Sequence, residues 1–266
     1  MYLRQALFSS LLVLSLLLTS SILAGAPPDK TSGPGLKGQT RTRDSRLDAR
    51  ATEKSIKDSI KNQEQILELE DKNSAGYPKQ SIALADFYWD LAEFYGNRIN
   101  SEEIEKPLYE AEQKGDTKAV EKWKREQQRL TDLKKKYQDE TIKRYRDVTK
   151  RFAKADNIDE IRYFLAYNLT EMGRGDEGIE EYTRIIGEHP TSPYVPDALV
   201  NIGDYYFELN DFGNAIKLYQ KAETYTEANI YGYAIYKQAW CLYNLADYKL
   251  SLARFIDVIK LADQRL

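Results

Sequence analysis

The segment Asn201–Ala222, NIGDYYFELNDFGNAIKLYQKA, has the pattern of a helical hairpin. Apolar and small side chains recur at helical spacing in each half. The first half has Ile202, Gly203, Tyr206 and Leu209, preceded by Leu199 just before the segment, and the second half has Ala215, Leu218, Tyr219 and Ala222. The residues between the two halves, Asn210–Asn214, are typical of a turn. A single hairpin of this kind has apolar surface on both sides, so we expect it to pack between neighbours.

The same pattern recurs in register before and after this hairpin. Gly203, Ala215, Tyr219 and Ala222 match Ala166, Gly178, Tyr182 and Ile185, which lie 37 residues earlier, and Ala239, Ser251, Phe255 and Val258, which lie 36 residues later. A matching turn follows each first helix, at Gly173–Asp176, Asn210–Phe212 and Ala246–Tyr248. A repeat of this length built from paired helices predicts a stack of hairpins.

In these features the chain resembles tetratricopeptide repeat (TPR) proteins. Pro190 closes the first copy as a proline often closes that motif, and the long repeat spacing resembles that of bacterial envelope TPR proteins. The resemblance implies an all-α fold, a TPR-like α-solenoid of stacked helical hairpins within residues 80–266. We expect repeats at about 158–190, 195–227 and 231–263.

The first 44 residues do not share the repeat pattern. Residues 1–26 have a short basic start with Arg4, an apolar run and Ala24-Gly25-Ala26 before Pro27, as in a secretory signal peptide. The alternative is a retained membrane anchor, since the apolar run is near the lower length limit for a membrane span. Residues 27–44 are rich in proline, glycine, serine and threonine, which predicts a flexible linker.

Residues 45–73 predict an amphipathic helix. Its apolar side chains lie near heptad spacing for about three heptads, at Leu47, Ala51, Ile56, Ile60 and Leu67. We expect this helix to cap the first repeat; the alternative is a short coiled coil with another chain. The segment Asn73–Pro78 ends the pattern.

One repeat, within residues 80–155, is interrupted by an insertion. Ala92 has the spacing of the small first-helix residue and so corresponds to Gly203. Thr141, Tyr145 and Val148 lie 37 residues before Gly178, Tyr182 and Ile185, so they are the second-helix residues of the same repeat. Ala92 and Thr141 are 49 residues apart where Gly203 and Ala215 are 12 apart, which leaves 37 extra residues.

The insertion, residues 97–138, is rich in charged residues and predicts two helices. Lys114-Gly115-Asp116-Thr117 breaks it and supplies a helix N-cap, so the second helix should run as one long element from about Lys118 into Phe152. Either it is a solvated helical surface or it is an arm that docks a partner. Trp123 is the candidate contact, because an aromatic side chain on a polar helix needs a covering group.

The first helices of the repeats are the candidate partner-binding surface. In TPR proteins the concave surface is lined by first-helix side chains, and the resemblance implies the same here. Large or charged residues out of phase with the packing positions are Tyr163, Tyr167, Asp204, Phe207, Tyr236, Trp240 and Tyr243. Their rigid aromatic area suits capture of a peptide or protein; the alternative is that some of them fill the interior.

Composition argues against other functions. A net charge of -3 does not suit a general nucleic-acid binder. The single histidine, His189, leaves no histidine-based triad or multi-histidine metal site, and no glycine-rich phosphate loop stands between a strand and a helix. The single cysteine, Cys241, is interpreted as a small core residue. We therefore expect no enzyme activity, no cofactor, no metal and no small-molecule substrate.

These observations predict an exported scaffold of a bacterial cell envelope, most simply periplasmic, whose partners are other envelope proteins or peptides. The run Ala234–Cys241 with Tyr243–Leu245 resembles a segment of TPR proteins in gliding-motility machineries. Alternatives are an envelope-assembly or division factor of the Tol-Pal-associated type, and a recognition domain of a longer chain with an enzyme beyond residue 266. The apolar last hairpin predicts either further repeats after it or a partner that covers it.

Overall fold

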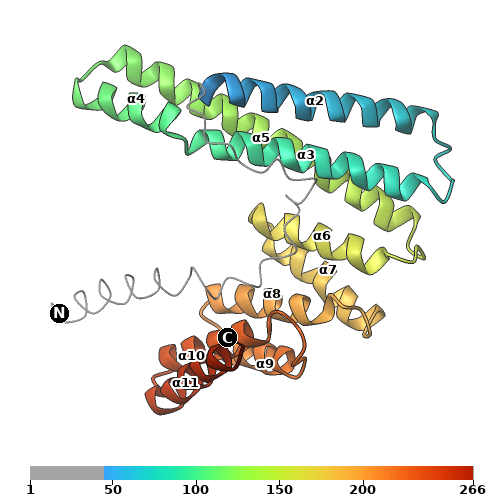
Figure 1. Ribbon diagram of the computed structural model, residues 1–266, viewed down its shortest axis with the longest axis vertical. Coiled ribbons are helices and arrows are strands. Elements are labelled where there is room, and N and C mark those ends of the chain that lie inside the picture. The colour runs from blue at the N-terminus through green and yellow to red at the C-terminus, as the bar shows by residue number, and fades with distance from the viewer. Residues whose placement is uncertain (1–44, 266) are drawn as a thin grey trace. The chain divides into compact units, whose positions relative to one another are not determined.

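The computed structural model describes residues 45–265, which form helices α2 to α11 and contain no strand (Figure 1). The all-α class is thus confirmed for this part of the chain. The predicted signal peptide, 1–26, and linker, 27–44, lie outside the described residues. The described chain forms two compact units, residues 45–181 and 182–265, with the boundary inside α7. They are called the N-terminal and C-terminal units below.

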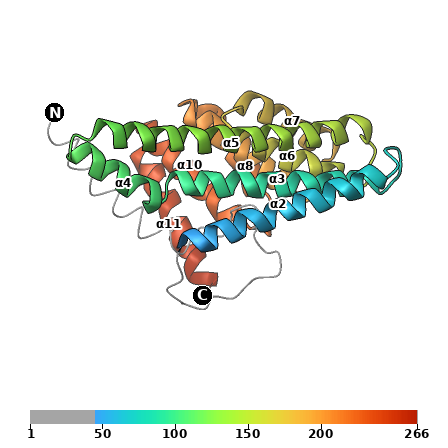
Figure 2. The same cartoon turned by 90° about the horizontal axis from the view of Figure 1, so that it is seen from above.

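The N-terminal unit is built on three long helices: α2 (Ser45–Leu69), α3 (Tyr77–Ile99) and α5 (Thr117–Arg151). The short helix α4 (Glu102–Gln113) folds back on the start of α5, as both views show (Figures 1 and 2). Helix α6 (Ile158–Glu171) and the first half of α7 (Gly175–Glu188) complete the unit. One apolar cluster joins α2, α3, α4 and α5, and a second joins α3, α5 and α6.

The insertion forms the two helices that the sequence predicts. Helix α4 ends at Gln113, and Gly115 follows with a φ of 66°, a conformation that favours glycine. The Asp116 carboxylate then accepts a hydrogen bond from the Ala119 amide and caps α5, whose 35 residues form one continuous helix. The prediction of a long second helix starting near Lys118 is confirmed.

Helix α2 packs on α3 within the chain, as the capping alternative predicts. Ile60 and Leu67 are buried in the same cluster as Leu84. Polar contacts reinforce this packing: the hydroxyl of Tyr88 donates to Glu64, at 2.6 Å. The helix ends at Leu69, earlier than the predicted residue 73.

The interrupted repeat has the predicted architecture but a different register on its first helix. The Thr141 hydroxyl donates to the Ala85 carbonyl over 56 positions, just as the Ser251 hydroxyl donates to the Ala239 carbonyl over 12 positions in the last hairpin. Ala85 therefore takes the place assigned to Ala92, and that assignment is wrong. The equivalent residues of the interrupted repeat are therefore separated by 44 more positions than those of an ordinary hairpin, where the sequence predicted 37. Ala92 is buried as well, one heptad further along the same face of α3, so spacing alone could not distinguish the two.

A second pair of contacts gives the same register. The Tyr145 hydroxyl donates to Asp86, at 2.7 Å and 59 positions apart, and the Tyr219 hydroxyl donates to Asp204, at 2.6 Å and 15 positions apart. These separations also differ by 44. In both hairpins the aspartate directly follows the small first-helix residue.

The C-terminal unit holds the hairpins α8 (Val195–Glu208) with α9 (Phe212–Glu223), and α10 (Tyr231–Asn244) with α11 (Tyr248–Arg265). Their turns share one backbone conformation, the left-handed one: Asn210 and Ala246 have φ values of 60° and 64°. Gly173, 37 residues before Asn210, has a φ of 75° in the α6–α7 turn. A left-handed residue after each first helix ends it and reverses the chain.

Small residues allow the helices of a hairpin to approach closely. A Cβ atom added at Gly178 would lie 2.9 Å from the Ala166 carbonyl oxygen and 2.6 Å from the Thr170 methyl group. A Cβ atom added at Gly203 would lie 2.7 Å from the Tyr219 ring. These positions therefore exclude larger side chains.

We predict that Gly178→Ala lowers the free energy of unfolding by about 1–3 kcal/mol, because the added methyl group meets backbone that cannot move aside. Gly187→Ala on the same helix is the control, since nothing lies within 4 Å of its Cβ position; alanine's helix propensity should there raise stability by roughly 0.5–1 kcal/mol. Urea unfolding measures both. Equal effects of the two substitutions would contradict the close approach.

Candidate partner-binding surface

The residues that the sequence predicts for binding gather mainly on two helices of the C-terminal unit. Helices α8 and α10 both pack against α9, and Tyr233 and Lys237 on α10 contact Asp204 and Phe207 on α8. We call the set the α8–α10 surface; its members are Asp204, Phe207, Tyr233, Tyr236, Lys237, Trp240 and Tyr243.

A partly buried polar network anchors this surface. The Asp204 carboxylate accepts hydrogen bonds from the hydroxyls of Tyr219, at 2.6 Å, and Tyr233, at 3.1 Å. It also forms an ion pair with Lys237, at 3.0 Å. The Lys237 ammonium lies 3.9 Å from the centre of the Phe207 ring, a cation–π distance. Asp204 thus ties α8, α9 and α10 together.

Electrostatics keep the two tyrosine hydroxyls of the network protonated. Burial, and then the charge and hydrogen bonding of Asp204, raise the pKa of both Tyr219 and Tyr233 far above the ordinary value. Both hydroxyls therefore remain protonated donors at every physiological pH. Burial also raises the pKa of the nearby Cys241 thiol to about 11, which makes it a poor nucleophile.

Aromatic side chains continue the surface from α10 onto α11. Trp240 contacts Tyr236 edge to face with ring centres 6.2 Å apart, and both rings contact Phe255, at 5.5 and 6.0 Å. Tyr243 extends the row by contacting Trp240 at 5.8 Å and Tyr248 at 5.4 Å. Tyr243 is 43% exposed and Tyr248 is 61% exposed, so the row ends in solvent.

Helix α11 also presents exposed aliphatic side chains. Leu250, Leu252, Ile256 and Ile259 are 41–62% exposed. In the preceding hairpin the second helix, α9, packs against the next first helix, α10. Leu252, Ile256 and Ile259 share one face of α11 and form a second exposed apolar surface.

The structure separates the predicted residues into three groups. Asp204 and Phe207 contact α10 through Tyr233 and Lys237, and Tyr233 also contacts Tyr236, the first residue of the row that continues to Trp240 and Tyr243. Tyr163 and Tyr167 lie on α6 in the N-terminal unit: Tyr163 is only 1% exposed and packs in the core, while Tyr167 is half-buried. Trp123 lies on α5, partly buried against the apolar cluster of the N-terminal unit.

Sequence reasoning missed Tyr233 and Lys237. Both have the helical spacing of Tyr236 and Trp240 on α10, which was the available signal for their face. The hydrogen bond of Tyr233 and the ion pair of Lys237 with Asp204 depend on how α10 lies relative to α8. Residue spacing within α10 does not predict that arrangement.

Among residues 45–265, no group of three or more histidine, cysteine, aspartate or glutamate side chains is placed to hold a metal ion. A search of the same residues for a helix long and apolar enough to cross a membrane found none.

Comparison with known proteins supports the repeat assignment. The tetratricopeptide repeat family matches residues 197–225, which cover nearly all of α8 and α9, so the chain contains a tetratricopeptide repeat. No curated protein matches the chain significantly. The crystal structure of BtubC (BKLC) from P. vanneervenii aligns with 82% of this chain and 92% of its own, at 15% identity and a TM-score of 0.40. A similarity this low carries no inference about function.

We predict that Asp204→Asn lowers the free energy of unfolding by about 1–3 kcal/mol, because it leaves the largely buried Lys237 ammonium without its counter-charge. Glu208→Gln, at an exposed site on the same helix, should change stability by less than about 0.5 kcal/mol. Urea unfolding followed by circular dichroism measures the difference. An Asp204→Asn protein as stable as the control would show that the network does not tie the hairpins together.

Proposed function

We propose that this protein is a non-enzymatic scaffold that binds a partner protein or peptide through the α8–α10 surface. The observation that carries the proposal is the aromatic row from Tyr236 to Tyr248, which is held in place by packing at one end and exposed at the other. Rigid aromatic side chains bury large area at small entropic cost, which makes them common anchors of binding surfaces. A tetratricopeptide repeat supports the same general role.

The chemistry of the surface defines the kind of partner. Its two charged groups, Asp204 and Lys237, neutralise each other, so the exposed area is mainly aromatic and hydroxyl. Such a surface suits a peptide or helix that presents apolar side chains with few charges. Binding should therefore depend little on salt.

The place of action follows from the sequence alone and stays a proposal. A signal peptide at residues 1–26 would export the chain, and a bacterial periplasm or cell envelope then supplies the partners. Resemblance of Ala234–Cys241 to gliding-motility proteins favours a part in that machinery. A coordinating factor of envelope assembly or cell division is the second candidate, although α2 packs on α3 within the chain and not in the coiled coil expected of such a factor. A recognition domain linked to an enzyme beyond residue 266 is the third.

The test is affinity purification with crosslinking from the native host, using the full chain. Tyr236 and Trp240 both pack on Phe255, so their removal would also loosen α10 from α11. Tyr243→Ala is the cleaner variant. Tyr225→Ala is its control, because Tyr225 is similarly exposed, 37% against 43%, but lies after α9 away from the surface.

We expect one set of partners, crosslinked to α8 and α10, whose affinity falls about tenfold with Tyr243→Ala and is unchanged with Tyr225→Ala. Recovery of partners to the same extent with both variants, or crosslinks confined to other helices, would contradict the proposal.

A further inference from the structure

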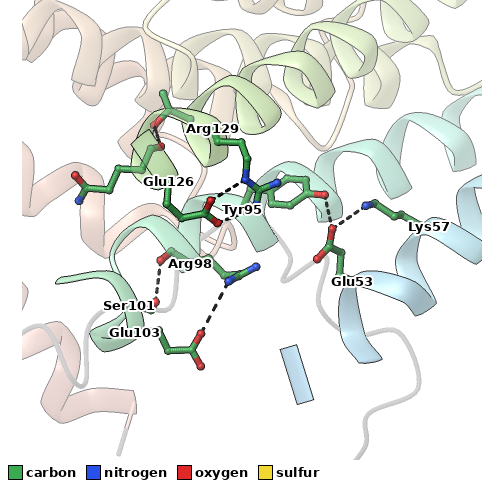
Figure 3. A network of polar contacts seen from close by, with 10 residues as sticks. Glu53, Lys57, Tyr95, Arg98, Ser101, Glu103, Glu126 and Arg129 are labelled. Atoms are coloured by element: carbon green, nitrogen blue, oxygen red, sulfur yellow. Dashed lines mark hydrogen bonds and ion pairs between the residues drawn. The ribbon is translucent and has the colours of Figure 1, made fainter. Parts of the chain in front are cut away.

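The N-terminal unit contains a pocket that the α8–α10 surface does not explain. It has a volume of about 690 Å³ and lies where α2, α3, α4 and α5 meet. Its wall therefore includes both helices of the insertion, together with the start of α2 and the end of α3. Figure 3 shows the polar side chains that reach into this region from the four helices.

The wall of the pocket carries more positive than negative charge. Its basic side chains are Arg50, Arg98, Lys122, Arg125 and Arg129, and its acidic side chains are Glu53, Glu103 and Glu126. The surplus of two cations contrasts with the chain as a whole, whose net charge is -3. A local reversal of charge in a concave site attracts anionic groups.

Two of the three carboxylates already have a basic partner: Glu126 pairs with Arg129 within the wall, and Glu53 pairs with Lys57 outside it. Glu126 accepts two hydrogen bonds from Arg129, at 2.7 and 2.8 Å, and this pairing holds the pKa of Glu126 below its usual value against the opposing effect of burial. Burial alone would raise the pKa of Glu53, but hydrogen bonds from Lys57 and Tyr95 hold it low (Figure 3). Both carboxylates are thus ionised and already hydrogen-bonded to side chains of the protein.

Other cations keep unused binding capacity. Among residues 45–265, Arg50 and Lys122 form no ion pair with a carboxylate. Arg98 reaches Glu103 only at 4.0 Å, and its buried Nε atom has no hydrogen-bond partner in the described chain. The Arg98 side chain is 24% exposed, and the terminal N–H groups of an arginine can bind a carboxylate through two parallel hydrogen bonds.

The pocket also has an apolar part beside these cations. Ile104 is 2% exposed, and the partly buried Trp123 lies next to it in the wall. The Lys122 ammonium lies 5.4 Å from the centre of the Trp123 ring. A ligand that combines anionic groups with an apolar side chain therefore matches both the cations and Trp123.

We propose that this pocket binds an acidic segment of a partner protein, with carboxylates held by Arg50, Arg98 and Lys122 and an apolar side chain placed against Trp123. Cations spread over three helices match a peptide with carboxylates at several positions. The chain's own segment 27–44 is an unsuitable occupant, because it carries Lys30, Lys37, Arg41 and Arg43. The wall's three carboxylates and the chain's net charge disfavour a polyphosphate or nucleic acid.

Binding of a fluorescein-labelled peptide in which glutamates flank a central pair of leucines tests this site, with fluorescence anisotropy as the readout. The full chain is used, and a peptide with glutamine in place of every glutamate is the ligand control. Arg50→Gln/Lys122→Gln removes the two unpaired cations. Lys54→Gln/Lys135→Gln makes the same charge change on the same two helices at exposed positions outside the pocket.

We expect the acidic peptide to bind and the glutamine peptide to bind much more weakly. Arg50→Gln/Lys122→Gln should raise the Kd for the acidic peptide about tenfold, while Lys54→Gln/Lys135→Gln raises it less than twofold. Absence of saturable binding, equal losses for the two variants, or stronger competition by a single-stranded oligonucleotide than by unlabelled peptide would overturn the proposal. Because Arg50 and Lys122 lie in this pocket and not on the α8–α10 surface, such a failure leaves the α8–α10 proposal standing.

Discussion

The contact on which this structure depends is the close approach of a small second-helix residue to the backbone of the first helix. In two hairpins a hydroxyl makes the contact: Ser251 donates to the Ala239 carbonyl at 2.9 Å, and Thr141 donates to the Ala85 carbonyl at 3.2 Å. In another, Gly178 lies so near the Ala166 carbonyl that even a methyl group does not fit. Backbone cannot be repacked as a side chain can, so this contact sets both the register and the separation of the paired helices.

This constraint explains how one repeat tolerates a large insertion. The contacts of Thr141 and Tyr145 are those of an ordinary hairpin, although 44 more residues separate the partners. The additional chain extends α3 and α5 beyond the hairpin and adds α4, and α2 covers the apolar surface that results. The insertion thereby creates a pocket of basic and aromatic character, whereas the α8–α10 surface is aromatic with its charges paired. The two proposals together use this difference, since one chain with both sites can hold two partners of different chemistry.

Much of the fold was predictable because its signals are local. The steps of 37 and 36 residues located the three complete hairpins, and the turn residues Gly173, Asn210 and Ala246 all have positive φ. Asp116 marked the start of α5 by its capping bond. The first-helix register of the interrupted repeat was not predictable, because Ala85 and Ala92 lie on one face. The sequence left open that some of the aromatic residues fill the interior, but did not indicate that Tyr163 is one of them. That burial and the bonds of Asp204 depend on how separate helices pack. Export, localisation and partners stay predictions.

A double-mutant cycle tests the register of the interrupted repeat most directly. Tyr145→Phe is combined with Asp86→Asn in one cycle and with Glu93→Gln in another, since Glu93 would face Tyr145 if Ala92 occupied the small first-helix position. Urea unfolding of the single and double mutants should give a coupling energy of about 1–2 kcal/mol between Tyr145 and Asp86 and roughly none between Tyr145 and Glu93. Coupling to Glu93, or no coupling to Asp86, would contradict an ordinary hairpin split by 44 residues.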